Sequence, residues 1–152
     1  MRYVRLVVPI LTCFVLASCA STALQGYEGL ARPDDETALI STRRPSRSAR
    51  SPVSSADIVS IQLPHGTLPT DTRLARVLPG ETCILFEALV RREDFVDSAS
   101  AYLCFEADAG TTYALRVSAP DGEIVGFRLE NQRTRELVAA AGIVPERRSR
   151  RR

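Results

Sequence analysis

Short segments in which apolar and polar residues alternate recur along the chain from residue 57 onward. The clearest spans residues 82–90, where every second side chain is apolar and points to one face of an extended strand. The residues of this face are Ile84, Phe86, Ala88 and Val90. Turn-forming Pro, Gly, Asp and Asn residues separate the segments, as expected for short antiparallel strands.

We predict further strands at six places, from apolar alternation or from a high content of β-branched residues. They are residues 38–40, 57–63, 73–78, 101–107, 111–118 and 124–130. In the segment that starts at residue 57, the two-residue period places Val59, Ile61 and Leu63 on one face. Residues 64–66 are predicted to form a turn, and residues 91–100 a polar loop.

The C-terminal part admits two predictions for residues 134–141. They form a strand after a hairpin loop, or a helix, because Glu, Leu and Ala favour helices. Several short strands bounded by turns predict an all-β fold, either a small antiparallel β-sandwich or an open barrel. We expect this domain to span residues 36–144.

Cys83 and Cys104 lie on the polar faces of two predicted strands, residues 82–90 and 101–107. If these strands pair antiparallel, their apolar faces meet in the core and the two cysteines fall together on the opposite face. A disulfide there would close a loop of about 20 residues and stabilise the fold by about 3 kcal/mol. Two small buried thiols are the alternative. A zinc site is not expected, because neither cysteine has a partner histidine or a second cysteine pair at ligand spacing.

The first 18 residues have the order of a secretory signal: basic residues, an apolar stretch, and small residues before a cleavage point. The apolar stretch is too short to span a membrane, which takes about 20 residues. It ends in a lipobox, in which a leucine and two small residues precede the cysteine that receives lipid. These residues are Leu16, Ala17, Ser18 and Cys19. Acyl chains on Cys19 would anchor the mature chain stably. The alternative is an ordinary signal peptide with a cysteine near the cut by chance.

Three segments differ in composition from the rest of the predicted domain: one before it, one within it and one after it. Residues 19–35 are mostly small and polar, which suits a flexible tether. An insertion rich in Arg, Ser and Pro (residues 41–56) and a basic tail (residues 145–152) offer too little apolar surface to order themselves. Residues 53–144 hold 8 arginines and 13 acidic residues, a net charge of −5. The body is therefore acidic and these two segments are basic.

The order of these segments resembles a group of small bacterial envelope lipoproteins of unknown function. The matching segments are the lipobox and residues 26–29, 38–40, 58–61, 77–80 and 105–113. The resemblance implies a PEGA-like β-sandwich. In lipoproteins of this kind, Ala20 after the modified cysteine implies transfer to the outer membrane, with the domain facing the periplasm. The resemblance implies no chemistry and no cofactor.

Two groups of residues could carry chemistry, and each has a simpler interpretation. His65 is the only histidine, and within a Pro-His-Gly triplet we expect it to be a turn residue. Glu93, Asp94 and Asp97 lack the ligand spacing of a calcium loop, and we expect them in a solvated loop. No Gly-x-Ser-x-Gly turn is present, and only His65 could act as a base, so we do not expect an enzyme. We expect no metal site either, because the acidic residues and the cysteines lack ligand spacing.

The C-terminal arginines are candidate anion ligands, because guanidinium groups bind phosphate and carboxylate with two hydrogen bonds. They are Arg147, Arg148, Arg150, Arg151 and Arg152. Export makes nucleic acid a poor partner, and a solubilising tail is the simpler interpretation. The sequence thus predicts a non-catalytic, lipid-anchored structural or protein-interaction module at the cell envelope. The alternative is a binding subunit for an envelope ligand such as a glycan or an anionic lipid.

Overall fold

The computed structural model describes residues 23–42, 52–92, 95–120 and 123–147. A six-stranded sheet contains, in spatial order, β1 (Leu24–Gln25), β5 (Leu74–Val77), β2 (Ala38–Thr42), β8 (Thr112–Ser118), β9 (Val125–Asn131) and β10 (Leu137–Ile143). A five-stranded sheet contains β11 (Glu146–Arg147), β7 (Val96–Ala107), β6 (Gly80–Arg91), β3 (Val53–Leu63) and β4 (Gly66–Thr72). One 3₁₀ turn, η1 (Asp34–Glu36), precedes β2.

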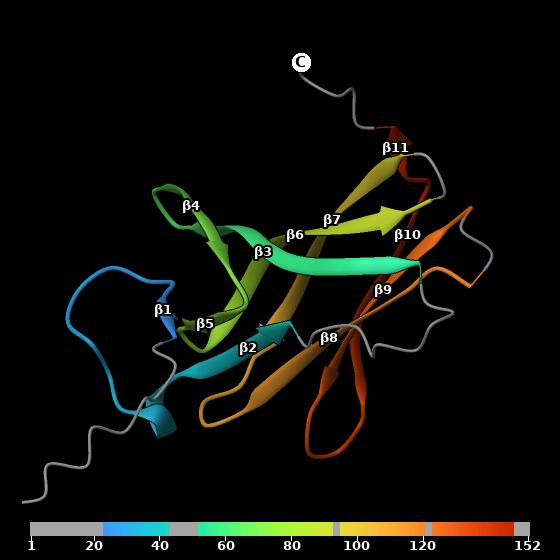
Figure 1. Cartoon of the computed structure of the whole chain (residues 1–152). Helices are drawn as coiled ribbons and strands as arrows, with labels where there is room; N and C mark the ends of the chain where they lie inside the picture. The colour runs from blue at the N-terminus through green and yellow to red at the C-terminus, as the bar shows by residue number, and fades with distance from the viewer. Residues whose placement is uncertain (1–22, 43–51, 93–94, 121–122, 148–152) are drawn as a thin grey trace, which may run out of the picture.

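The two sheets form an all-β sandwich, which confirms the predicted fold class. In Figure 1, β3 and β6 lie above β2 and β8. The space between the sheets is filled by apolar side chains from both. Among the largest that are fully buried are Phe86, Phe127, Tyr113, Ile40, Ile58 and Leu115. The described strands form two separate sheets and do not close into a barrel, which matches the first of the two predicted architectures, the sandwich.

The predicted apolar face of β6 is confirmed, since its four residues are each 0% exposed. The predicted face of β3 is correct only in part: Ile61 is buried and Leu63 packs against the core, but Val59 does not belong to the buried side. The pairing register of β3 shifts between Ile58 and Ser60, as in a β-bulge. A bulge adds one residue to the strand and so reverses the faces beyond it. Ile58 and Ile61 are therefore buried, while Val59 and Leu63 are only partly buried.

Three further predictions need correction or completion. Residues 96–100 belong to β7, not to a polar loop, and β4 was missed altogether. Residues 137–143 form the strand β10, which pairs antiparallel with β9, so the helix predicted as one possibility for residues 134–141 is wrong. Residues 64–65 form the turn between β3 and β4, as predicted.

The domain extends beyond its predicted boundaries. Residues 19–35 are not all tether, because β1 pairs in parallel with β5 and Tyr27 is buried. The ends of the predicted insertion 41–56 belong to β2 and β3. The predicted tail 145–152 begins with β11, which pairs with β7. The signal peptide 1–18 and residues 43–51 and 148–152 lie outside the described residues. No helix among the described residues is long and apolar enough to cross a membrane.

Candidate functional site

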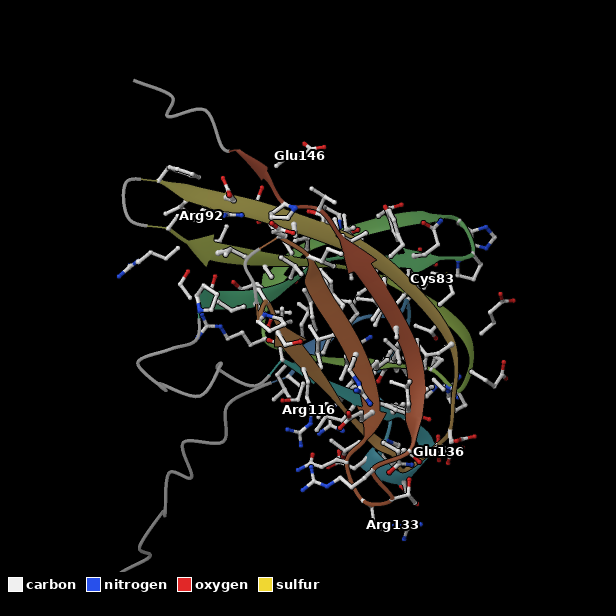
Figure 2. All side chains as sticks on the ribbon, turned by 90° about the vertical axis from the view of Figure 1, so that its right-hand side faces the viewer. Cys83, Arg92, Arg116, Arg133, Glu136 and Glu146 are labelled. Atoms are coloured by element: carbon white, nitrogen blue, oxygen red, sulfur yellow. A yellow bond between two sulfur atoms is a disulfide. The ribbon has the colours of Figure 1, made fainter. Side chains whose placement is uncertain are left out.

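A disulfide joins Cys83 of β6 to Cys104 of β7, as the strand pattern predicted. The two residues are direct partners in the antiparallel register, with Cα atoms 4.0 Å apart. The next pair in the register, Ile84 and Leu103, points into the core. Because side chains alternate along a strand, the disulfide lies on the outer face of the sheet. Figure 2 shows Cys83 and Arg92 near opposite ends of β6.

The outer surface around this bond combines apolar and acidic groups. We call it the disulfide face and define it by six residues: Glu81, Cys83, Leu85, Tyr102, Cys104 and Glu106. On one side of the bond, Leu85 pairs with Tyr102, whose side chain is 57% exposed. On the other side, Glu81 lies directly opposite Glu106, and both are exposed. Exposed tyrosine beside aliphatic surface is typical of protein interfaces, and the paired carboxylates favour a basic partner.

A cavity of about 310 Å³ opens at the end of the sandwich where residues 26–28 meet the β3–β4 and β5–β6 turns. Its walls include Leu63, Val77 and Leu78, and its polar lining includes the carboxylates Glu28 and Glu81. This volume lies at the lower end of the range for small-molecule sites. His65 also lines this cavity, in the turn where the sequence placed it. Sequence reasoning missed the cavity because its three segments are far apart along the chain.

Of the three acidic residues predicted to lie in a solvated loop, Asp97 is instead buried in a strand. Asp97 lies in β7 and is only 4% exposed. The Nε–H of Arg92 donates a hydrogen bond of 2.8 Å to Asp97 Oδ2, whereas Asp97 Oδ1 is buried without a hydrogen-bond partner. Glu93 and Asp94 lie outside the described residues. The described part of the chain contains no group of three His, Cys, Asp or Glu side chains that could hold a metal ion.

A buried tyrosine ties the β7–β8 turn to the core. The hydroxyl of Tyr113 accepts a hydrogen bond of 3.0 Å from the backbone N–H of Asp108 and lies 3.2 Å from Asp108 Oδ2. Its ring also meets Phe105 edge-on, with centroids 5.1 Å apart. Burial raises the pKa of the Tyr113 hydroxyl, because the phenolate would lose its hydration.

Charges on the outer face of the six-stranded sheet are largely compensated. Glu130 accepts a hydrogen bond from Arg116 at 2.7 Å and lies 3.6 Å from Arg128. Figure 2 shows Arg116 on this sheet, with Arg133 and Glu136 at the tip of the β9–β10 hairpin, away from Cys83. Exposed pairs of this kind contribute little to stability.

The remaining predicted site residues are not brought together by the described structure. The lipobox residues Leu16, Ala17, Ser18 and Cys19 lie outside the described residues, and so do Arg148, Arg150, Arg151 and Arg152. The backbone of Arg147 belongs to β11 and stands opposite Asp97 in the register. Lipid attachment and anion binding by the tail therefore stay predictions.

No protein-family model, no curated protein and no solved structure matches this chain. The resemblance to envelope lipoproteins stays a prediction from the sequence.

Proposed function

We propose that the protein is an outer-membrane lipoprotein that faces the periplasm. Its sandwich acts there as a non-catalytic structural or protein-interaction module of the cell envelope. The observation that carries the proposal is the Leu16-Ala17-Ser18-Cys19 sequence at the end of the apolar leader. This arrangement supplies both an export signal and a residue for acylation.

The disulfide supports the same compartment. Bonds such as Cys83–Cys104 persist in exported proteins and are rare in the reducing cytosol. The disulfide face supports an interaction role, because Tyr102 and Leu85 are apolar groups presented at a surface rather than in the core. Under this proposal the partner is a protein with basic groups that meet Glu81 and Glu106.

Anchoring is tested by intact mass of the protein extracted from native membranes, with thiol alkylation before and after reduction. We expect a chain that starts at Cys19 and carries acyl groups, with Cys83 and Cys104 alkylated only after reduction. Cys19→Ala should abolish the acyl mass and membrane retention. Cys13→Ala is the matched control, because this cysteine leaves with the leader. An unacylated chain cut at another residue would refute the proposal.

The interaction role is tested with charge changes on the two sheet faces. Tyr102→Glu should abolish co-purification with an envelope complex under mild solubilisation, because it replaces the exposed aromatic ring, the main apolar contact of this face, with a charge that is costly to bury in an interface. Arg128→Glu is the control on the outer face of the other sheet. Equal co-purification of wild type and the Tyr102 variant would contradict a role for the disulfide face.

The cavity favours a second candidate function, a binding subunit for a small envelope ligand. The carboxylates of Glu28 and Glu81 disfavour an anionic lipid there, so a neutral glycan is the better candidate. Titration with neutral oligosaccharides, followed by NMR, should shift His65 and Leu63 resonances together. Absence of any shift at millimolar sugar would exclude this alternative.

A further inference from the structure

The segment between β1 and η1 carries an unusually exposed apolar side chain. Leu30 is 91% exposed, the highest value among the exposed large hydrophobic residues of the described chain. Figure 1 shows this segment looping out from the body of the sandwich beside β1. Single exposed apolar residues are common on protein surfaces, so exposure alone assigns no role to Leu30.

The loop is held in place from both ends. The side-chain amide of Gln25 donates hydrogen bonds to the carbonyl oxygens of Tyr27 and Gly29, at 3.1 and 2.8 Å. The hydroxyl of Tyr27, whose residue is only 7% exposed, accepts a hydrogen bond of 2.9 Å from the backbone N–H of Arg32. Gly29 has a φ of 99°, a conformation that other residues rarely adopt. Leu30 is therefore presented by an ordered loop and is not exposed by fraying.

The loop also lies close to the predicted anchor. Five peptide steps separate Cys19 from Leu24 at the start of β1, and a chain of this length spans at most about 18 Å. Gln25, the second residue of β1, contacts Gly29, the neighbour of Leu30. An acylated Cys19 would thus keep this loop within reach of the membrane surface.

The charges around the loop decide what kind of contact it makes. Arg32 is exposed, but so are Glu28, Asp35 and Glu36, while Asp34 pairs with Arg76 at 2.7 Å. This acidic surrounding gives no attraction to anionic head groups. An exposed leucine instead gains by leaving water for the apolar part of the bilayer interface.

We propose that Leu30 inserts into the lipid bilayer beside the acyl chains of Cys19. The acyl chains are the first contact of the protein with the membrane and Leu30 is the second. Two contacts fix the orientation of the sandwich on the membrane. The inference rests on the proposed function, since it requires the anchor. The loop tip inserts into the acyl region of the bilayer, and this insertion requires no anionic lipid.

The chain contains no tryptophan, so Leu30→Trp creates a single fluorescent reporter. The acylated full-length variant, with acylation verified by mass, is placed in phosphatidylcholine vesicles that carry brominated acyl chains. We expect a blue-shifted emission that bromine quenches and soluble acrylamide does not. Val144→Trp is the matched control. Val144 is 71% exposed and lies between β10 and β11, and Figure 1 shows β11 on the opposite side of the sandwich from β1. Its reporter should be quenched by acrylamide alone.

The outcomes separate this inference from the proposed function. A chain without acyl mass overturns the anchor itself. An acylated, vesicle-bound protein whose Leu30→Trp reporter is quenched only by acrylamide overturns the insertion and leaves the anchor intact. Bromine quenching that is equal at both positions, or that requires phosphatidylglycerol, also overturns the insertion of Leu30 as stated. Quenching at the Leu30 position alone, equal with and without anionic lipid, supports it.

Discussion

Removal of the disulfide should lower the free energy of unfolding by about 3 kcal/mol. The bond joins residues 21 apart in the sequence. Closing a loop of this length removes conformational entropy from the unfolded chain, which corresponds to about 3 kcal/mol at 25 °C in the chain-entropy model. The perturbation is the double variant Cys83→Ala, Cys104→Ala.

The position of the bond makes this magnitude interpretable. Cys104 is exposed and Cys83 is partly buried, and both lie on the outer face of the sheet. Two alanines at these positions leave no cavity in the core, where Ile84 and Leu103 stay packed. The loss of stability should therefore come from the unfolded state.

The assay is equilibrium unfolding in urea of the mature domain, oxidised and reduced. The double alanine variant and the reduced wild type should agree in midpoint, and both should show a larger m-value than the oxidised protein, because the unfolded chain without the bond exposes more surface. Ser98→Ala, on the same face of β7, is the control and should change stability by less than about 0.5 kcal/mol. A loss below about 1 kcal/mol in the double variant would refute the reasoning.

Three further predictions concern buried groups. Arg92→Ala should cost about 2–3 kcal/mol in chemical denaturation, because it removes the hydrogen bond and the positive charge that Arg92 supplies to the buried carboxylate of Asp97, and adding Asp97→Asn should restore most of this loss. Gly26→Ala should cost about 1–3 kcal/mol, since its new Cβ would lie 2.5 Å from a side-chain carbon of β3 and 2.8 Å from a backbone oxygen of β5. Gly142→Ala, whose nearest contact is 3.4 Å, should be nearly neutral in the same thermal melts. Because burial raises the pKa of Tyr113 above 10, its stabilising effect is complete below pH 10 and is lost as the pH rises through the folded-state value. Tyr113→Phe should thus flatten the fall of stability as the pH rises above 10, and an unchanged slope would contradict this assignment.

Strand identity was predictable where the apolar alternation runs without interruption. In β6, the period of two continues from Ile84 to Val90 because this strand lies in the middle of its sheet and packs one face on the core. In β3, the bulge near Ile58 reverses the faces, and a bulge leaves no mark in the sequence of a Ser- and Val-rich strand. Alternation therefore located the strand and assigned Ile61 to the buried side correctly, but it placed Val59 there in place of Ile58.

The missed strands have a common physical cause. β4 contains Pro69 and three threonines, and Leu68 is its only aliphatic residue. Such a composition is typical of an edge strand, where proline is tolerated because one side makes no ladder hydrogen bonds. β1 is two residues long and owes its place to packing, with the N–H of Gly26 donating to the carbonyl of Arg76 at 2.7 Å. Local propensity cannot predict strands that tertiary contacts define.

The features of the candidate site were likewise predictable only where they depend on strand alternation. Strand parity placed Cys83 and Cys104 on the polar faces of their strands, and the disulfide followed only if these strands pair antiparallel, which the register of β6 and β7 confirms. The burial of Asp97 was not, because a Val-Asp-Ser-Ala segment has the polarity of a loop, and only the packing of β7 places this carboxylate inside. The cavity beside His65 likewise depends on three segments that are not adjacent in the sequence.

The edges of the two sheets indicate how the sandwich meets a partner. An exposed edge strand can pair with another chain, and proteins suppress this by making edges short, charged or interrupted by proline. β1 and β11 are two residues long, and β4 carries Pro69. The fourth edge, β10, has no charged residue but lies in contact with β7 of the other sheet. Strand addition is thus disfavoured at three of the four edges and obstructed at the fourth. A protein partner is therefore expected to dock on a face, and the disulfide face offers exposed aromatic surface around Tyr102.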